Sequence, residues 1–106
     1  MKESKERRLN YVTYYIAGDA HCPKLIAVTA YWNDLTAVFN FYFDGTPTDD
    51  EVEDASDIAT EVICQFEGDV LLEEHYIAWD KSKPVPEENI AYKKEEGWKP
   101  PSLRNR

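Results

Sequence analysis

Basic residues are almost absent from the middle of this 106-residue chain. Residues 9–80 contain a single lysine, Lys24, against 15 of the 21 acidic residues, so this segment has a formal net charge of −14. The other 11 of the 12 basic residues lie in residues 1–8 and 81–106. A surface so short of positive charge repels nucleic acid phosphates and anionic lipids. The sequence therefore predicts no direct binding to nucleic acid or membranes, and it favours a basic protein as partner.

Glycine, cysteine and long hydrophobic runs are also scarce. The four glycines form no phosphate-binding loop, and no apolar run is long enough to span a bilayer. The polar, basic start is not followed by the apolar segment of a signal peptide, so we expect a cytoplasmic protein. The cysteines, Cys22 and Cys64, lie far apart, and in a reducing compartment both are expected to be free thiols.

The histidines and cysteines lack the spacing of a metal site. His21, Cys22, Cys64 and His75 include no close Cys-x-x-Cys or His-x-x-x-His pair. The acidic residues after Asp44 do not follow the twelve-residue calcium-binding pattern, and no serine lies in the sequence context of an activated nucleophile. We therefore expect no metal, no cofactor and no enzymatic activity.

The length suits a single domain, residues 1–106. The first half of this domain is predicted to consist of strands. After a frayed lead-in at residues 1–8, the β-branched and aromatic residues 10–17 predict a first strand. Residues 24–32 and 35–43 predict two more, joined by a tight hairpin at Asn33-Asp34. Every odd-numbered position of the third strand is apolar, so this face is expected to lie on the core.

The clearest helix signal begins at Thr48. Thr48 is a good N-cap, Glu51 is its capping-box partner, and apolar residues recur every three or four positions up to Phe66. Gly68 is the expected stop signal.

A fourth strand is predicted at residues 73–80, after the helix. Beyond it, prolines interrupt regular pairing, so residues 81–106 are expected to form a C-terminal arm that packs back on the body at a few points. The elements together predict an α+β fold: an antiparallel sheet of about four strands with one main amphipathic helix on one face. Their predicted order is strand-strand-strand-helix-strand.

Carboxylates form a stripe on the solvent side of the predicted helix, at spacings of three and four. Like charges at that spacing cost about 0.2–0.5 kcal/mol per pair, so a helix that keeps them is expected to use the charge. Exposed aromatic residues beside carboxylates are good anchors for protein binding. The predicted partner-binding residues are Asp50, Asp54, Asp57 and Glu61 of the stripe, with Glu73, Glu74 and Tyr42.

Three segments resemble small immunity proteins of bacterial toxin systems, and the likeness covers most of residues 10–92. The segments are Tyr14-Tyr15-Ile16-Ala17-Gly18-Asp19, Phe41-Tyr42-Phe43-Asp44-Gly45, and Asp54-Ala55-Ser56 with Thr60-Glu61-Val62-Ile63. The nearest type is the cognate inhibitor of contact-dependent growth inhibition and related polymorphic toxin loci. The resemblance implies a non-enzymatic, cytoplasmic antitoxin that binds the C-terminal domain of one toxin, often a nuclease, and blocks it.

The charge and the resemblance favour the same function. A nuclease toxin needs a positive active-site cleft, which an acidic inhibitor can fill after fast, electrostatically steered association. Two other classes stay open. One is an adaptor domain that meets its partner by adding a strand to a sheet edge. The other is a small ligand-binding domain or enzyme with a pocket under the aromatic strands, which a buried carboxylate of raised pKa would indicate.

Overall fold

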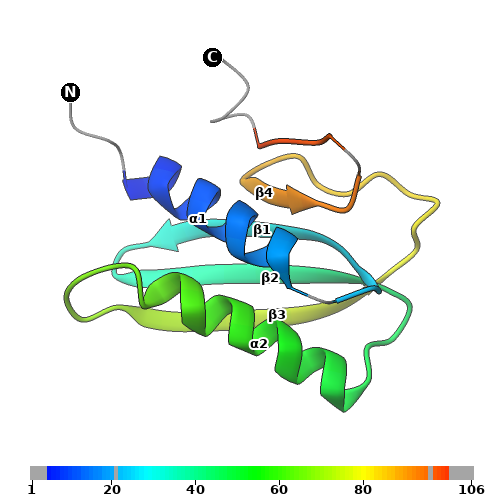
Figure 1. The fold of residues 1–106 in the computed structure, drawn as a ribbon, viewed down its shortest axis with the longest axis horizontal. Helices are drawn as coiled ribbons and strands as arrows, with labels where there is room; N and C mark the ends of the chain where they lie inside the picture. The colour runs from blue at the N-terminus through cyan, green and yellow to red at the C-terminus, as the bar shows by residue number, and fades with distance from the viewer. Residues whose placement is uncertain (1–4, 21, 96, 101–106) are drawn as a thin grey trace.

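The fold is that of a computed structural model, which describes residues 5–20, 22–95 and 97–100 (Figure 1). These residues form two helices and one four-stranded sheet of strand order β3-β2-β1-β4. Both helices lie on the same face of the sheet (Figure 1). The elements in chain order are α1 (Lys5–Asp19), β1 (Leu25–Asn33), β2 (Thr36–Asp44), α2 (Asp49–Ile63), β3 (Leu71–Trp79) and β4 (Ile90–Lys93). The α+β class and the number of about four strands are therefore as predicted. The structure differs in having two helices instead of one main helix, and its element order is α-β-β-α-β-β instead of strand-strand-strand-helix-strand.

Strands β1 and β2 form the predicted hairpin, one residue later than expected. Asn33 pairs with Thr36, so the turn consists of Asp34 and Leu35. Asp34 has a φ of 60°, a left-handed conformation that aspartate tolerates. Leu35 was predicted to lie on the core. Because it lies in the turn, its side chain is instead 58% exposed.

The rest of the apolar face of β2 forms the centre of the core. Ala37, Phe39, Phe41 and Phe43 have no exposed surface. The rings of Phe39 and Phe41 stack at 6.0 Å between centroids, and Tyr76 of β3 continues the stack at 5.7 Å from Phe41. The period-two pattern of β2 predicted this face correctly, because successive side chains of a strand point to opposite faces.

The sheet is mostly antiparallel but contains one parallel pair. Strands β2 and β3 run parallel over nine pairs, from Thr36 with Leu71 to Asp44 with Trp79. A parallel pair needs a crossover connection, and α2 supplies it across the helical face of the sheet. The prediction of an antiparallel sheet is thus corrected for this pair.

The prediction of a first strand at residues 10–17 was wrong, because these residues lie in α1. Its buried residues Leu9, Thr13 and Ala17 are four positions apart, which is the spacing of one helix face. Packing of that face on the sheet outweighs the β propensity of the tyrosines between them. Residues 5–8, predicted to be part of a frayed lead-in, form the first turn of the same helix.

Helix α2 begins as predicted and ends earlier. Thr48 is its N-cap, with both bonds of the capping box to Glu51 present. The helix ends at Ile63, with Cys64 as its C-cap, so Gly68 does not end it. Gly68 instead has a φ of 94° in the loop that leads to β3.

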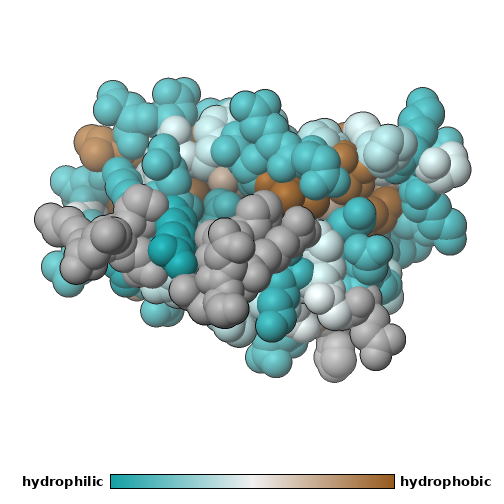
Figure 2. Space-filling view, turned by 90° about the horizontal axis from the view of Figure 1, so that it is seen from above, coloured by the Kyte–Doolittle hydropathy of each residue, from teal (hydrophilic) through white to brown (hydrophobic). Residues whose placement is uncertain are grey.

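The segment predicted to be an arm without regular pairing contributes β4, which pairs antiparallel with β1. Val85 and Ile90 from this segment pack with Ala27 and Tyr42 on the sheet face opposite the helices. Trp98 adds a partly buried contact, so the segment packs back on the body as predicted. Seen from above, the molecule is mainly hydrophilic, and hydrophobic residues show only in small areas (Figure 2).

The substitution Thr48→Ala is expected to lower the free energy of unfolding by about 1 kcal/mol. The Thr48 side-chain hydroxyl accepts a hydrogen bond from the Glu51 backbone N–H at 3.2 Å, and alanine removes it. The matched control is Thr46→Ala, an exposed threonine outside the capping box. Urea denaturation measures both variants, and an equal loss in the two would contradict the assigned cap.

Substitution by valine is expected to have opposite effects on stability at the two buried threonines. Thr13 Oγ1 has no hydrogen-bond partner among the described residues, whereas Thr29 Oγ1 accepts from Asn40 Nδ2 at 3.1 Å. Because an unsatisfied buried hydroxyl costs about 1–3 kcal/mol, Thr13→Val is expected to stabilise the fold by about 1 kcal/mol. Thr29→Val is expected to destabilise it by about 1 kcal/mol. Thermal melts that gave the reverse order would contradict the assignment.

Candidate protein-binding site

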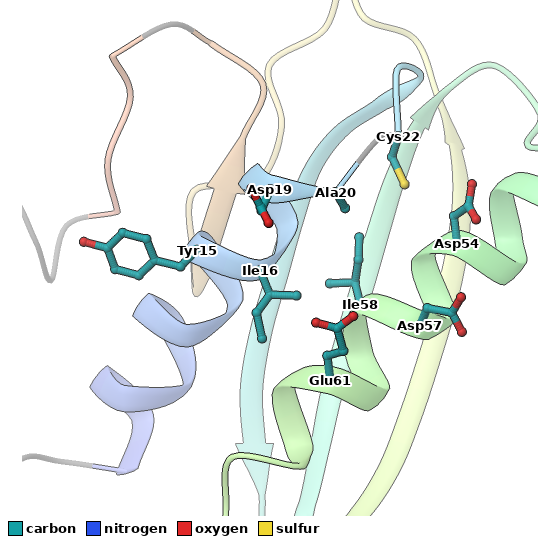
Figure 3. A pocket seen from close by; sticks show the side chains of 9 residues that line it. All are labelled: Tyr15, Ile16, Asp19, Ala20, Cys22, Asp54, Asp57, Ile58 and Glu61. Atoms are coloured by element: carbon teal, nitrogen blue, oxygen red, sulfur yellow. The ribbon is translucent and has the colours of Figure 1, made fainter.

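A hollow of 610 Å³ lies between the C-terminal end of α1 and the middle of α2 (Figure 3). We call it the interhelix groove. Ile16 and Ile58 lie between the two helices and form its apolar floor (Figure 3). The residues that line it are Tyr15, Ile16, Asp19, Ala20 and Cys22 from α1 and the following loop, and Asp54, Asp57, Ile58 and Glu61 from α2.

The start of α1 is held beside the end of α2. Arg8 donates a hydrogen bond to the backbone oxygen of Gln65, and its guanidinium lies 4.6 Å from the ring centroid of Phe66. The Lys5 ammonium lies 4.0 Å from the ring centroid of Trp32. The helices therefore run antiparallel, and the end of α1 reaches the middle of α2. Lys5 and Arg8 thus contact aromatic rings at the start of α1, and neither cation lies at the groove.

Four carboxylates surround the groove without a cation from the described part of the chain. Asp19, Asp54, Asp57 and Glu61 form no ion pair and no hydrogen bond with another described residue. The last turn of α1 contains no basic residue, and the C-terminal end of a helix carries partial negative charge. The groove is therefore a concentrated negative site that a cationic ligand would stabilise.

The thiol of Cys22 lies in this negative field. Burial raises the pKa of Cys22, and the carboxylates of Asp54 and Glu51 raise it further. A raised pKa keeps the thiol protonated and poorly nucleophilic at neutral pH. Cys22 and Cys64 are both free, and Cys22 is a wall of the groove rather than a reactive group.

The structure brings together three of the four carboxylates of the predicted stripe. Asp54, Asp57 and Glu61 all line the groove and are exposed. Asp50 is exposed in the first turn of the same helix but does not line the groove. The spacing of three and four along the helix thus predicted a shared face, and the structure adds that this face borders α1.

Two of the other predicted residues lie on the opposite face of the sheet. Glu73 is exposed on β3, and its Oε2 lies 2.6 Å from Nε2 of His75, within hydrogen-bond distance. Tyr42 of β2 is only 7% exposed, and its ring packs edge-to-face on Trp79 at 5.1 Å between centroids. Neither residue belongs to the interhelix groove.

Glu74, the remaining predicted residue, is half-buried on the helical side of β3. It accepts a hydrogen bond from the hydroxyl of Tyr76. Burial, with a contribution from this bond, raises the pKa of Tyr76 to about 12. The phenol therefore stays protonated at neutral pH and continues to donate to Glu74.

The α1 side of the groove was missed from the sequence. Tyr15 is the one aromatic residue among those that line the groove; it is 62% exposed at the rim, and its ring points away from Ile16 and Ile58 (Figure 3). Asp19 adds a fourth carboxylate. The sequence patterns predict a strand at residues 10–17 that ends at a turn with Gly18 and Asp19, so neither residue is expected at a helix face. The signal that could have found them is the spacing of Leu9, Thr13 and Ala17, which fits a helix.

Neither a metal-ligand cluster nor a membrane-spanning helix occurs among the described residues. They contain no group of three or more His, Cys, Asp or Glu side chains arranged to hold a metal ion. His21, which the sequence analysis considered, lies outside the described residues. Neither helix of the described part combines the length and the apolar character needed to cross a bilayer.

The comparisons with known proteins identify the family. A family model described as MafI2 immunity protein matches residues 20–96, which is well over half of the chain. The match begins directly after α1 and includes all four strands and α2. Searches of curated proteins and of solved structures gave no significant match. The chain belongs to the MafI2 immunity protein family, in agreement with the resemblance to immunity proteins noted from its sequence.

Proposed function

We propose that this protein neutralises a basic toxin domain of the nuclease class by placing the interhelix groove against its active-site cleft. Membership of an immunity protein family supports the toxin-neutralising role. One observation carries the choice of site: four carboxylates surround a 610 Å³ hollow without a cation from the described residues. A nuclease must present cationic side chains to bind phosphates, and these are the groups that the groove lacks.

The inhibition proposed here is occlusion. Lysine or arginine side chains of the toxin enter between Asp19 and Glu61, where charge-assisted hydrogen bonds to carboxylates are strong. The floor of Ile16 and Ile58 keeps water away from the centre of the contact, which strengthens these bonds. Tyr15 at the rim offers an aromatic face for a further cation. No step requires chemistry by the inhibitor, so the protein acts as a binding protein and needs no cofactor.

The wider charge distribution favours fast capture. Residues 9–80 carry a net charge of −14. A field of this sign steers a basic partner toward the protein and raises the association rate constant, which for steered pairs reaches about 10⁸–10⁹ M⁻¹s⁻¹ at low salt. Speed matters for an inhibitor because a toxin that is captured late has already acted on the cell. We propose that neutralisation takes place in the cytoplasm, where the nucleic acid that the toxin would cleave is located.

Association with the toxin is expected to be tight and dependent on salt. The probe is the C-terminal domain of the toxin encoded by the adjacent upstream reading frame, co-purified with this protein. Raising the salt concentration from about 0.05 M to 0.5 M is expected to slow association about tenfold or more, because screening removes steering. Stopped-flow fluorescence measures the rate. A tight complex with a rate indifferent to salt would move the interface away from the groove, and no complex would contradict neutralisation by binding.

Removing two groove charges is expected to weaken binding more than removing two charges elsewhere. The test variant is Asp57→Asn with Glu61→Gln, and the matched control is Glu87→Gln with Glu88→Gln in the exposed loop before β4. The groove variant is expected to lose at least about tenfold in affinity, or about 1.4 kcal/mol. The control is expected to change affinity by less than about threefold, as is usual for charges outside an interface.

Calorimetry measures both affinities, and growth of cells that produce the toxin gives an independent readout. The groove variant is expected to protect such cells less than the control does. Equal losses in the two variants would show that only the total charge matters and would contradict the assigned site.

A further inference from the structure

The two edges of the sheet differ in how they are protected. Strand β4 forms one edge with only four residues, and its register with β1 shifts between Val28 and Thr29. Strand β3 forms the other edge with nine residues in continuous register with β2. The sequence of β3 contains no proline, lysine or glycine. Proteins usually protect sheet edges by shortness, bulges, proline, lysine or other charged side chains. Of these devices β3 has only the carboxylates of Glu73 and Glu74.

The backbone groups on the outer side of β3 can be assigned from its bonds to β2. The Leu71 N–H donates to the Leu35 oxygen at 3.0 Å, and the Trp79 oxygen accepts from the Gly45 N–H at 3.2 Å. Odd-numbered residues of β3 therefore bond to β2, because backbone groups alternate in direction along a strand. The N–H and C=O groups of the even-numbered residues Leu72, Glu74, Tyr76 and Ala78 point outward. Within the described residues no strand pairs with this side.

The side chains beside this edge define the chemistry of a matching strand. On the face away from the helices, Leu71 is 62% exposed, Glu73 and His75 are exposed, and Ile77 is half-buried. An added strand would cover Leu71 and Ile77 with apolar residues. A lysine or arginine between them would lie near Glu73. The edge thus fits an extended segment with a cation flanked by apolar residues.

We propose that an extended segment of the cognate toxin adds to the outer edge of β3 as a fifth strand. This inference rests on the proposed function, because the toxin is the partner in both. Helix α2 lies between the two surfaces: it borders the interhelix groove on the side of α1 and packs on β3 on its other side (Figure 1). One basic domain that contacts both surfaces would therefore hold α2 from two sides, with backbone hydrogen bonds at β3 and ion pairs at the groove.

Amide hydrogen exchange tests the edge directly and contains its own control. In the free protein, the outward amides of Leu72, Glu74, Tyr76 and Ala78 are expected to exchange fast. The inward amides of Glu73 and Ile77 are expected to exchange slowly, because they bond to β2. NMR then compares the free protein with its complex with a catalytically inactive toxin domain. Binding is expected to slow the four outward amides about 100-fold or more.

Each result of this experiment bears on one proposal. A complex in which the four outward amides still exchange fast overturns strand addition and leaves the groove proposal standing. Absence of any complex removes the proposed function itself. Protection that rises with protein concentration in the absence of toxin means that a second copy occupies the edge, which also overturns the proposal.

A proline substitution gives an independent test. Ala78→Pro removes one outward donor without breaking the ladder to β2, since proline is tolerated where an edge-strand N–H points away from the sheet. The matched control is Ala78→Thr, which keeps the N–H and suits a strand. With melting temperatures checked for both, the proline variant is expected to bind the toxin domain at least about tenfold more weakly. Equal affinities of the two variants would overturn the proposal.

Discussion

Burial of one face of β2 is the constraint on which the rest of the structure depends. Phe39, Phe41 and Phe43 are completely buried, and a strand in the middle of the sheet can hide them only if helices cover that face. Both helices meet this need with small and apolar residues. These are Leu9 and Ala17 of α1, and Ala55, Ile58, Ala59 and Val62 of α2. The interhelix groove exists because two helices share this cover and leave a hollow above their common floor.

Local signals predicted the parts of the fold that local physics determines. The alternation in β2 and the capping box of Thr48 each act within a few residues, and the structure confirms both. The parallel pairing of β2 with β3 and the pairing of β1 with β4 join distant segments, so no local pattern fixes them. The prediction for the residues of α1 failed for a related reason. The tyrosines of this segment favour a strand locally, and only packing on the sheet selects the helix. The candidate site shows the same contrast between local signals and long-range packing. The α2 carboxylates were predicted from their local spacing, whereas the α1 wall was not predicted.

The helical layer separates its charges along its length. At the start of α1, Lys5 and Arg8 lie over the rings of Trp32 and Phe66, so their charge is used within the protein. At the other end of α1, Asp19 joins the α2 carboxylates without such partners. A basic partner, as proposed above, would thereby be oriented as well as attracted, because only one end of the layer is strongly negative. The family match starts after α1, so this helix completes the groove from outside the matched region.

The parallel crossover also has a consequence for the order of folding. The β1–β2 hairpin joins neighbouring residues and can form early, whereas pairing Thr36 with Leu71 must wait for the closure of a long loop that contains α2. The groove and the outer edge of β3 both depend on that one closure, because α2 forms a wall of the first and connects to the second. A newly made chain would therefore gain both proposed toxin-binding surfaces together in a late step. Until that step it would lack both proposed surfaces, even though its sequence already carries the full negative charge.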